Sequence, residues 1–151
     1  MNHIRWIFFD IGSTLVDESR VYENRIQEIT RVNNIDLSEF TAKVRQRAKT
    51  EQKPIMSVAG EYGVRVSAWR HDLEILYPDA KEILQILSKK YKLGIIANQD
   101  FGTEQRLTAF DIRQYIDLVI ASAEEGVAKP DLKVFFRLPL IVQIASLKKL
   151  L

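Results

Sequence analysis

Three short apolar runs, each ending at a polar residue, constrain the fold of this chain more than any other feature. The runs cover residues 4–9, 93–97 and 117–121, and the residues that close them are Asp10, Asn98 and Ser122. Short apolar runs rich in β-branched and aromatic residues are typical of strands that are buried on both faces. Parallel strands end at one edge of a sheet, where ligands bind, so we expect these three polar residues to face one crevice.

Helical periodicity fills the segments between these runs. The sequence predicts amphipathic helices over residues 21–33, 38–52, 66–77, 79–90 and 103–110, with no regular period over 55–63. Alternating helices and buried strands indicate an α/β fold. We expect a Rossmann-like parallel sheet with helices on both faces.

Composition limits the remaining possibilities. The 151 residues are enough for one core with a small appended subdomain. No apolar run approaches the roughly 18 residues that span a bilayer, so we expect no membrane insertion. The chain has no cysteine, which fits a cytoplasmic protein, and its net charge of +2 is too small to indicate a nucleic-acid partner.

The segments around the predicted strand ends carry recognisable motifs. Residues 9–17 read Phe-Asp-Ile-Gly-Ser-Thr-Leu-Val-Asp, residues 93–98 read Leu-Gly-Ile-Ile-Ala-Asn, and residues 122–131 end in Lys-Pro-Asp. In this order, the segments resemble three motifs of the haloacid dehalogenase-like family of phosphohydrolases. The resemblance implies a core domain over residues 1–16 and 77–151. It also implies a small helical cap over residues 17–76, inserted after the first strand, which in the family selects the substrate.

The resemblance implies a role for each matching residue. Asp10 matches the nucleophile and Lys129 the residue that neutralises both the nucleophile and the phosphate. The phosphate-binding positions implied are Gly12, Ser13, Thr14 and Asn98. The cofactor implied is Mg²⁺, with the Asp10 carboxylate and the Gly12 backbone carbonyl among its ligands, and the partner implied is a small phosphorylated substrate.

The sequence also departs from the family pattern. Gly12 stands where phosphatases of the family usually carry an Asp that acts as general acid and base, a role commonly worth about 100- to 10,000-fold in rate. Ala97 replaces a hydroxyl residue, and no acid follows Asp131 to complete a magnesium site. We therefore expect the C-terminal strands of the family to be missing, with self-association through the exposed sheet edge. One hypothesis is a shifted reading frame near residues 135–136.

Several functions remain open from the sequence. The first is Mg²⁺-dependent hydrolysis of a phosphomonoester through an aspartyl-phosphate. The alternative is a catalytically silent or truncated family member that binds a phosphorylated ligand or a protein partner. Dehalogenation of a haloacid uses the same Asp without a metal. A phosphoacceptor receiver domain also pairs an Asp with a Lys, but it needs further acids near its N-terminus and has no helical insertion.

Overall fold

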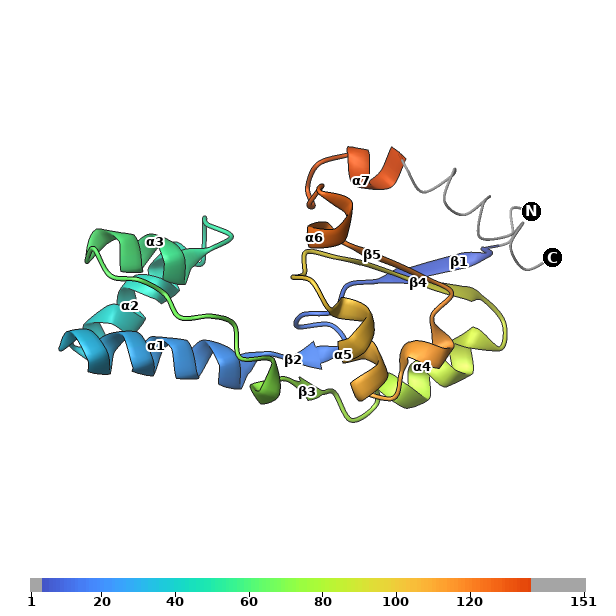
Figure 1. Ribbon diagram of the computed structural model, residues 1–151, viewed down its shortest axis with the longest axis horizontal. Coiled ribbons are helices and arrows are strands. Elements are labelled where there is room, and N and C mark those ends of the chain that lie inside the picture. Colours follow the sequence, from blue (N-terminus) through green and yellow to red (C-terminus); the bar gives the residue numbers. More distant parts are fainter. Residues whose placement is uncertain (1–3, 137–151) are drawn as a thin grey trace. The chain divides into compact units, whose positions relative to one another are not determined.

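The structure is a computed structural model that describes residues 4–136, and the chain divides into two units (Figure 1). One unit holds the chain up to Asp17 and from Leu76 onward, and the other is Glu18–Ile75. Each boundary between the two units lies one residue from the boundary expected for a cap over residues 17–76. The expectations of a shifted frame near residues 135–136 and of missing C-terminal strands concern the tail after Phe135, of which residues 137–151 lie outside the described residues.

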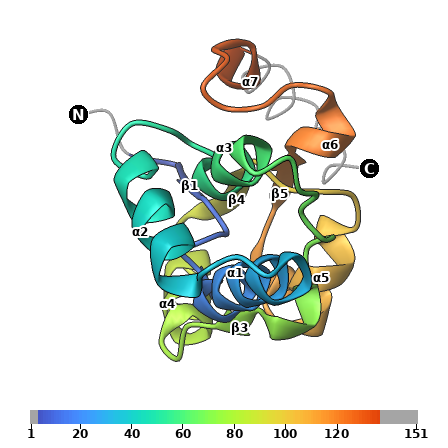
Figure 2. The same ribbon diagram turned by 90° about the vertical axis from the view of Figure 1, so that its left-hand side faces the viewer.

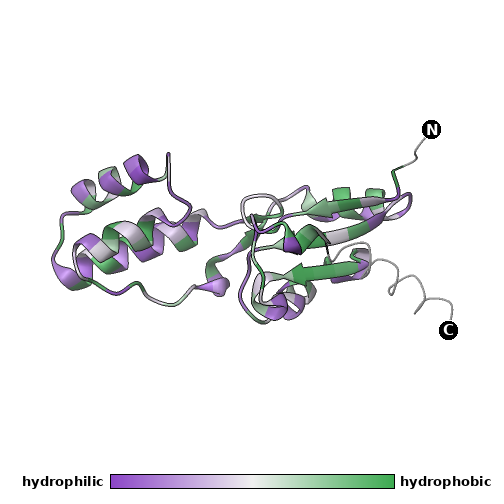
Figure 3. Ribbon diagram, turned by 90° about the horizontal axis from the view of Figure 1, so that it is seen from above, coloured by the Kyte–Doolittle hydropathy of each residue, from purple (hydrophilic) through white to green (hydrophobic). Residues whose placement is uncertain are grey.

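The first unit is built on a parallel sheet, which confirms the α/β fold class. Its strands are β1 (Trp6–Phe9), β4 (Lys92–Ala97) and β5 (Leu118–Ala121), in the order β1-β4-β5. These strands are coloured mostly hydrophobic in Figure 3. β4 is buried along almost its whole length because it lies between the other two strands. Within the described residues β1 and β5 are the edges of this sheet, and self-association through such an edge stays a prediction.

Helices cover both faces of the sheet. On one face, α4 (Ala80–Ser88) and α5 (Thr103–Ala109) place Leu84 and Leu107 against Leu93 and Ile95 of β4. On the other face, Val134 of α7 (Lys133–Phe136) packs with Ile96. The described part of this unit also contains two short helical segments, α6 (Ser122–Glu125) and η2 (Arg113–Tyr115).

Gly94 of β4 leaves room for the ring of Phe8 on β1 because it has no side chain. A Cβ at this position would overlap Cε1 and Cδ1 of Phe8, whose ring also stacks on Trp6 with a centroid distance of 5.5 Å. We therefore expect Gly94→Ala to lower the free energy of unfolding by about 1–3 kcal/mol through overpacking. The midpoint and slope of urea unfolding check this expectation.

Gly60 provides the matched control for that substitution. It lies within α3 (Pro54–Glu61), and a Cβ there has no neighbour within 4 Å. Gly60→Ala should leave the unfolding midpoint unchanged or raise it, since alanine favours the helix by about 1 kcal/mol. Equal destabilisation by both substitutions would contradict the packing explanation.

The second unit is helical. It contains α1 (Ser19–Asn33), α2 (Leu37–Arg47) and α3, with α2 packed against both other helices (Figure 2). Its core is a cluster of apolar side chains from the three helices: Ile29, Phe40, Val44, Ile55, Val58 and Ala59. The Asp36 side chain accepts a hydrogen bond from the Glu39 amide at 2.7 Å and so starts α2. Pro54 occupies the first turn of α3, a helix that the irregular pattern over residues 55–63 did not predict.

The helix predicted over residues 66–77 is wrong. That stretch contains only the 3₁₀ turn η1 (His71–Leu73) and the strand β3 (Ile75–Leu76), which pairs with β2 (Val16–Asp17). Side-chain contacts account for the difference, because Trp69 Nε1 donates to the buried Glu74 carboxylate at 2.7 Å and the Arg25 guanidinium stacks on the Trp69 ring. Together, the local bond to Glu74 and the contact with the distant Arg25 outweigh a weak helical period.

No helix within residues 4–136 is long and apolar enough to cross a membrane.

Candidate active site

Asp10 is the first residue after β1 and stands at the carboxyl end of the sheet. Its side chain is 42% exposed to solvent, so the carboxylate is open to an incoming ligand. Oδ1 accepts a hydrogen bond from the Ile11 amide at 2.8 Å. This contact orients the carboxylate and leaves Oδ2 pointing to a second donor.

That second donor is Lys129, 119 residues away in the sequence. Lys129 Nζ donates to Asp10 Oδ2 at 2.7 Å, and the lysine side chain is 27% exposed. The structure thus brings together the two residues that the resemblance implies for catalysis. An ammonium at this place offsets negative charge both on the carboxylate and on an anion that approaches it.

Asn98 follows β4, and its side chain contacts the main chain of Lys129. The Lys129 amide donates to Asn98 Oδ1 at 2.7 Å, and Asn98 Nδ2 donates to the Lys129 carbonyl at 2.9 Å. A phosphate-binding role for Asn98 stays a prediction, with its second Nδ2 hydrogen as the donor. The two contacts observed are to the lysine loop.

The loop after Asp10 closes on itself. The Ser13 amide donates to the Val16 carbonyl at 2.8 Å, and the Thr14 amide donates to the Ile11 carbonyl at 3.2 Å. These two amides are therefore committed to hydrogen bonds within the loop. Binding of phosphate at Gly12, Ser13 and Thr14 stays a prediction that now rests on the Gly12 amide and the two exposed hydroxyls.

Metal ligands are few in this region. The donors suggested by the resemblance are the Asp10 carboxylate and the Gly12 carbonyl. Within residues 4–136, no group of three His, Cys, Asp or Glu side chains is placed to hold a metal ion. Magnesium commonly binds through one or two carboxylates together with waters and substrate phosphates, so two oxygen donors fit a weakly held ion.

Hydrogen bonds that the sequence did not predict also join the ends of β4 and β5. The Ser122 hydroxyl accepts from the Gln99 amide at 3.1 Å and donates to the Gln99 carbonyl at 3.2 Å. Arg106 Nη2 in turn donates to Gln99 Oε1 at 2.6 Å. Ser122 was expected at this edge, but no pattern in the sequence pointed to Gln99 or Arg106.

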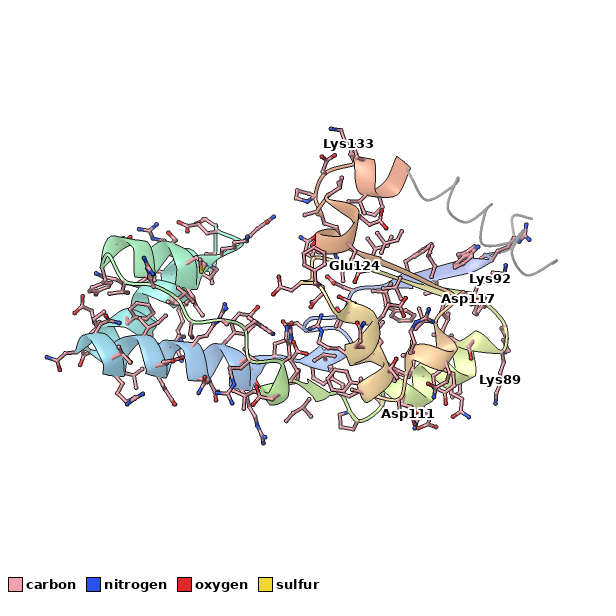
Figure 4. The ribbon with its side chains drawn as sticks, viewed as in Figure 1. Lys89, Lys92, Asp111, Asp117, Glu124 and Lys133 are labelled. Carbon is pink, nitrogen blue, oxygen red and sulfur yellow. The ribbon has the colours of Figure 1, made fainter. Side chains whose placement is uncertain are left out.

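The opposite end of the sheet, where Figure 4 labels Lys92 and Asp117, has its own polar contacts. Asp117 Oδ2 accepts from the Leu93 amide at 3.1 Å, and its own amide donates to the Leu93 carbonyl at 2.7 Å. Asp117 therefore closes the start of the β4-β5 pair. Its carboxylate lies at the wrong end of the strands to assist Asp10.

The fold and the site define a class: a Rossmann-like α/β protein in which a strand-end carboxylate pairs with a lysine from a distant loop. The sequence profile of the haloacid dehalogenase-like hydrolases matches residues 4–138. The chain belongs to the haloacid dehalogenase-like hydrolase family.

Known proteins similar to this chain agree with that assignment. Over 59 residues the chain is 41% identical to the pyrimidine 5'-nucleotidase YjjG of Escherichia coli, a match that covers 38% of this chain and 26% of that protein. The match therefore spans about a quarter of the curated relative's length.

Solved structures of low sequence identity show the same fold. A haloacid dehalogenase-superfamily hydrolase from Geobacter sulfurreducens has a TM-score of 0.65 and 17% identity, over 90% of this chain and 72% of the other. A phosphatase of the superfamily from Thermococcus onnurineus has a TM-score of 0.60 and 20% identity, over 89% and 69%. The hydrolase YfnB from Bacillus subtilis, solved with bound magnesium, has a TM-score of 0.62 and 17% identity, over 91% and 72%.

Proposed function

We propose that this protein hydrolyses a phosphomonoester of a small metabolite with Asp10 as nucleophile. The observation that carries the proposal is the contact between Lys129 Nζ and Asp10 Oδ2 at 2.7 Å. It gives a partly exposed strand-end carboxylate a fixed positive charge beside it, which is what attack on an anionic phosphoryl group requires. Family membership supports the same chemistry.

The reaction has two steps. In the first, an Asp10 carboxylate oxygen forms a bond to phosphorus while the bond from phosphorus to the ester oxygen breaks, and the leaving alkoxide takes a proton from water. In the second, water adds to the phosphorus of the aspartyl-phosphate, the bond to Asp10 breaks, and inorganic phosphate leaves. Splitting the hydrolysis in this way replaces one difficult displacement by two easier ones.

The residues around Asp10 supply positive charge and hydrogen-bond donors. Lys129 neutralises the carboxylate and the phosphoryl oxygens. In the transition state the charge of the phosphoryl group spreads over its oxygens. The donors proposed for these oxygens are the Gly12 amide, the Ser13 and Thr14 hydroxyls, and the second Nδ2 hydrogen of Asn98.

We propose Mg²⁺ as the cofactor, held by the Asp10 carboxylate and the Gly12 carbonyl. When bound, it supplies further positive charge for the phosphate oxygens. With one carboxylate and one carbonyl as protein ligands, the affinity should be low and should depend on the substrate phosphate. The cysteine-free sequence supports a cytoplasmic location, which imaging of a tagged protein would test.

Nucleoside 5'-monophosphates are the first substrates to test, given the similarity to YjjG. Gly12 adds a restriction on the leaving group, since its position carries no acid to protonate the ester oxygen. Esters with good leaving groups, such as p-nitrophenyl phosphate, should therefore turn over faster than nucleotides.

Phosphate release from both kinds of ester, with and without Mg²⁺, tests the proposal. We expect release in millimolar Mg²⁺ that stops on chelation, with p-nitrophenyl phosphate ahead of the nucleotides. Absence of release from every ester at high enzyme concentration would contradict the proposal.

A second function is favoured by the residues that depart from the family pattern. Gly12 offers no general acid, and Ala97 offers no hydroxyl to a phosphate. A silent family member would bind a phosphorylated ligand without turnover. It should then gain thermal stability as ligand is added, while phosphate release stays at the uncatalysed rate.

A further inference from the structure

Asn98 makes an unusually complete contact with one neighbour. Its side-chain amide pairs with both main-chain groups of Lys129, accepting from the N–H at 2.7 Å and donating to the C=O at 2.9 Å. The two residues are 31 apart in the sequence. An amide side chain that takes up both polar groups of one residue fixes that residue in place and in orientation.

Asn98 is itself well anchored. It follows Ala97, the last residue of the buried central strand, and Ala97 lies opposite Ala121 in the register of β4 and β5. The next residue, Gln99, is joined to Ser122 by hydrogen bonds in both directions. The loop that carries Lys129 is thereby tied to a rigid strand end.

The main chain at Lys129 has little packing of its own to hold it in place. The residues that flank it, Ala128 and Pro130, are exposed, and the loop gains little from packing there. The ammonium of Lys129 nevertheless has to meet Asp10 Oδ2 at 2.7 Å. A main chain that moved by one ångström would lose this contact, since hydrogen bonds of this kind weaken steeply with distance and angle.

We infer that Asn98 is a positioning residue that holds the Lys129 main chain so that its ammonium meets Asp10. The catalytic meaning of this role rests on the proposed function, whereas the coupling of Asn98 to Lys129 does not. Asn98→Ala removes both hydrogen bonds. Asn98→Asp keeps the acceptor for the Lys129 amide and removes the donor to the Lys129 carbonyl.

Acylation of lysines by an N-hydroxysuccinimide ester, followed by mass spectrometry, measures the coupling directly. An amine held against a carboxylate has to leave it before it can react, so Lys129 should react slowly in the native protein. Each lost hydrogen bond is worth a factor of roughly 2 to 10. We expect Lys129 to react at least about fivefold faster in Asn98→Ala, with Asn98→Asp between that variant and the native protein.

Two references keep the result specific. Lys89, an exposed lysine after α4, serves within each sample, and the ratio of Lys129 to Lys89 labelling should rise only when the pair is broken. Gln105→Ala removes another exposed neutral amide, on α5, and should leave the ratio unchanged. If Asn98→Ala unfolds the protein, Asn98→Asp gives the same comparison with one bond retained. An unchanged ratio in a folded Asn98 variant would overturn the inference.

Kinetics separate positioning from direct binding of the phosphate. Loss of positioning should lower kcat with little change in KM, because the charge that Lys129 supplies matters most in the transition state. A raised KM with unchanged kcat, together with native labelling of Lys129, would leave Asn98 with phosphate binding as its only role and overturn the inference. If the native protein has no phosphatase activity, the proposed function fails while the labelling result still decides the role of Asn98.

Discussion

Asp10→Asn should reduce phosphate release by about 1,000-fold or more. Asparagine keeps the shape of the side chain and an oxygen for the Ile11 amide, which is the contact at 2.8 Å. It removes the negative charge that faces Lys129 and replaces the carboxylate with an amide, which is a much weaker nucleophile toward phosphorus. Loss of a nucleophile is among the largest effects that a single substitution has on an enzyme. Steady-state release of phosphate from p-nitrophenyl phosphate provides the measurement.

Asp79→Asn is the matched control for this variant. Asp79 is exposed at the start of α4 and its side chain makes no capping hydrogen bond. The control should keep native activity, and both variants should keep native circular dichroism. If Asp10→Asn retained activity within tenfold of the native protein, Asp10 would not be the nucleophile.

Lys129→Met should reduce kcat by about 100- to 1,000-fold, the range found when one stabilising donor is removed from a transition state. Methionine retains most of the length and the apolar stem of lysine but has no charge. The Asp10 carboxylate then loses its partner at 2.7 Å, and its negative charge opposes the approach of a phosphate dianion. The kcat and KM of the variant, measured at saturating Mg²⁺, test this expectation.

Lys133→Met is the matched control for Lys129→Met, since it removes another lysine close by in the sequence. Lys133 is exposed on α7 (Figure 4), and within the described residues no ion pair of its ammonium is observed. Lys133→Met should therefore keep kcat within about twofold of the native value. A similar loss in both variants would mean that overall charge, rather than the contact with Asp10, controls the rate.

The strands could be predicted from the sequence because their patterns are local, and the Asp10–Lys129 pair could be predicted from the family resemblance. The runs that end at Asp10 and Asn98 are continuous and apolar, and such runs leave few alternatives to a buried parallel strand. The motif around Lys129 matched a family in which the lysine and the strand-end carboxylate meet. The structure places these two side chains 2.7 Å apart.

The remaining details depend on contacts between distant residues. The helix predicted over residues 66–77 failed in part because Arg25, far away in the sequence, stacks on the indole of Trp69, which also bonds to Glu74. The pairing of Asn98 with the Lys129 main chain depends on how two loops meet, which no periodic pattern encodes. The inward-pointing amides of Ser13 and Thr14 likewise follow from the closed turn after Asp10.

A covalent intermediate on Asp10 is the central claim, and trapping it is the most direct test. The protein would be mixed with a nucleoside monophosphate or an aryl phosphate labelled with ³²P in its phosphate group, quenched in acid, digested and mapped. The account predicts label on the peptide that contains Asp10, none in Asp10→Asn, and loss of the label in mild base. Phosphate release without label at Asp10, or label on another residue, would contradict it.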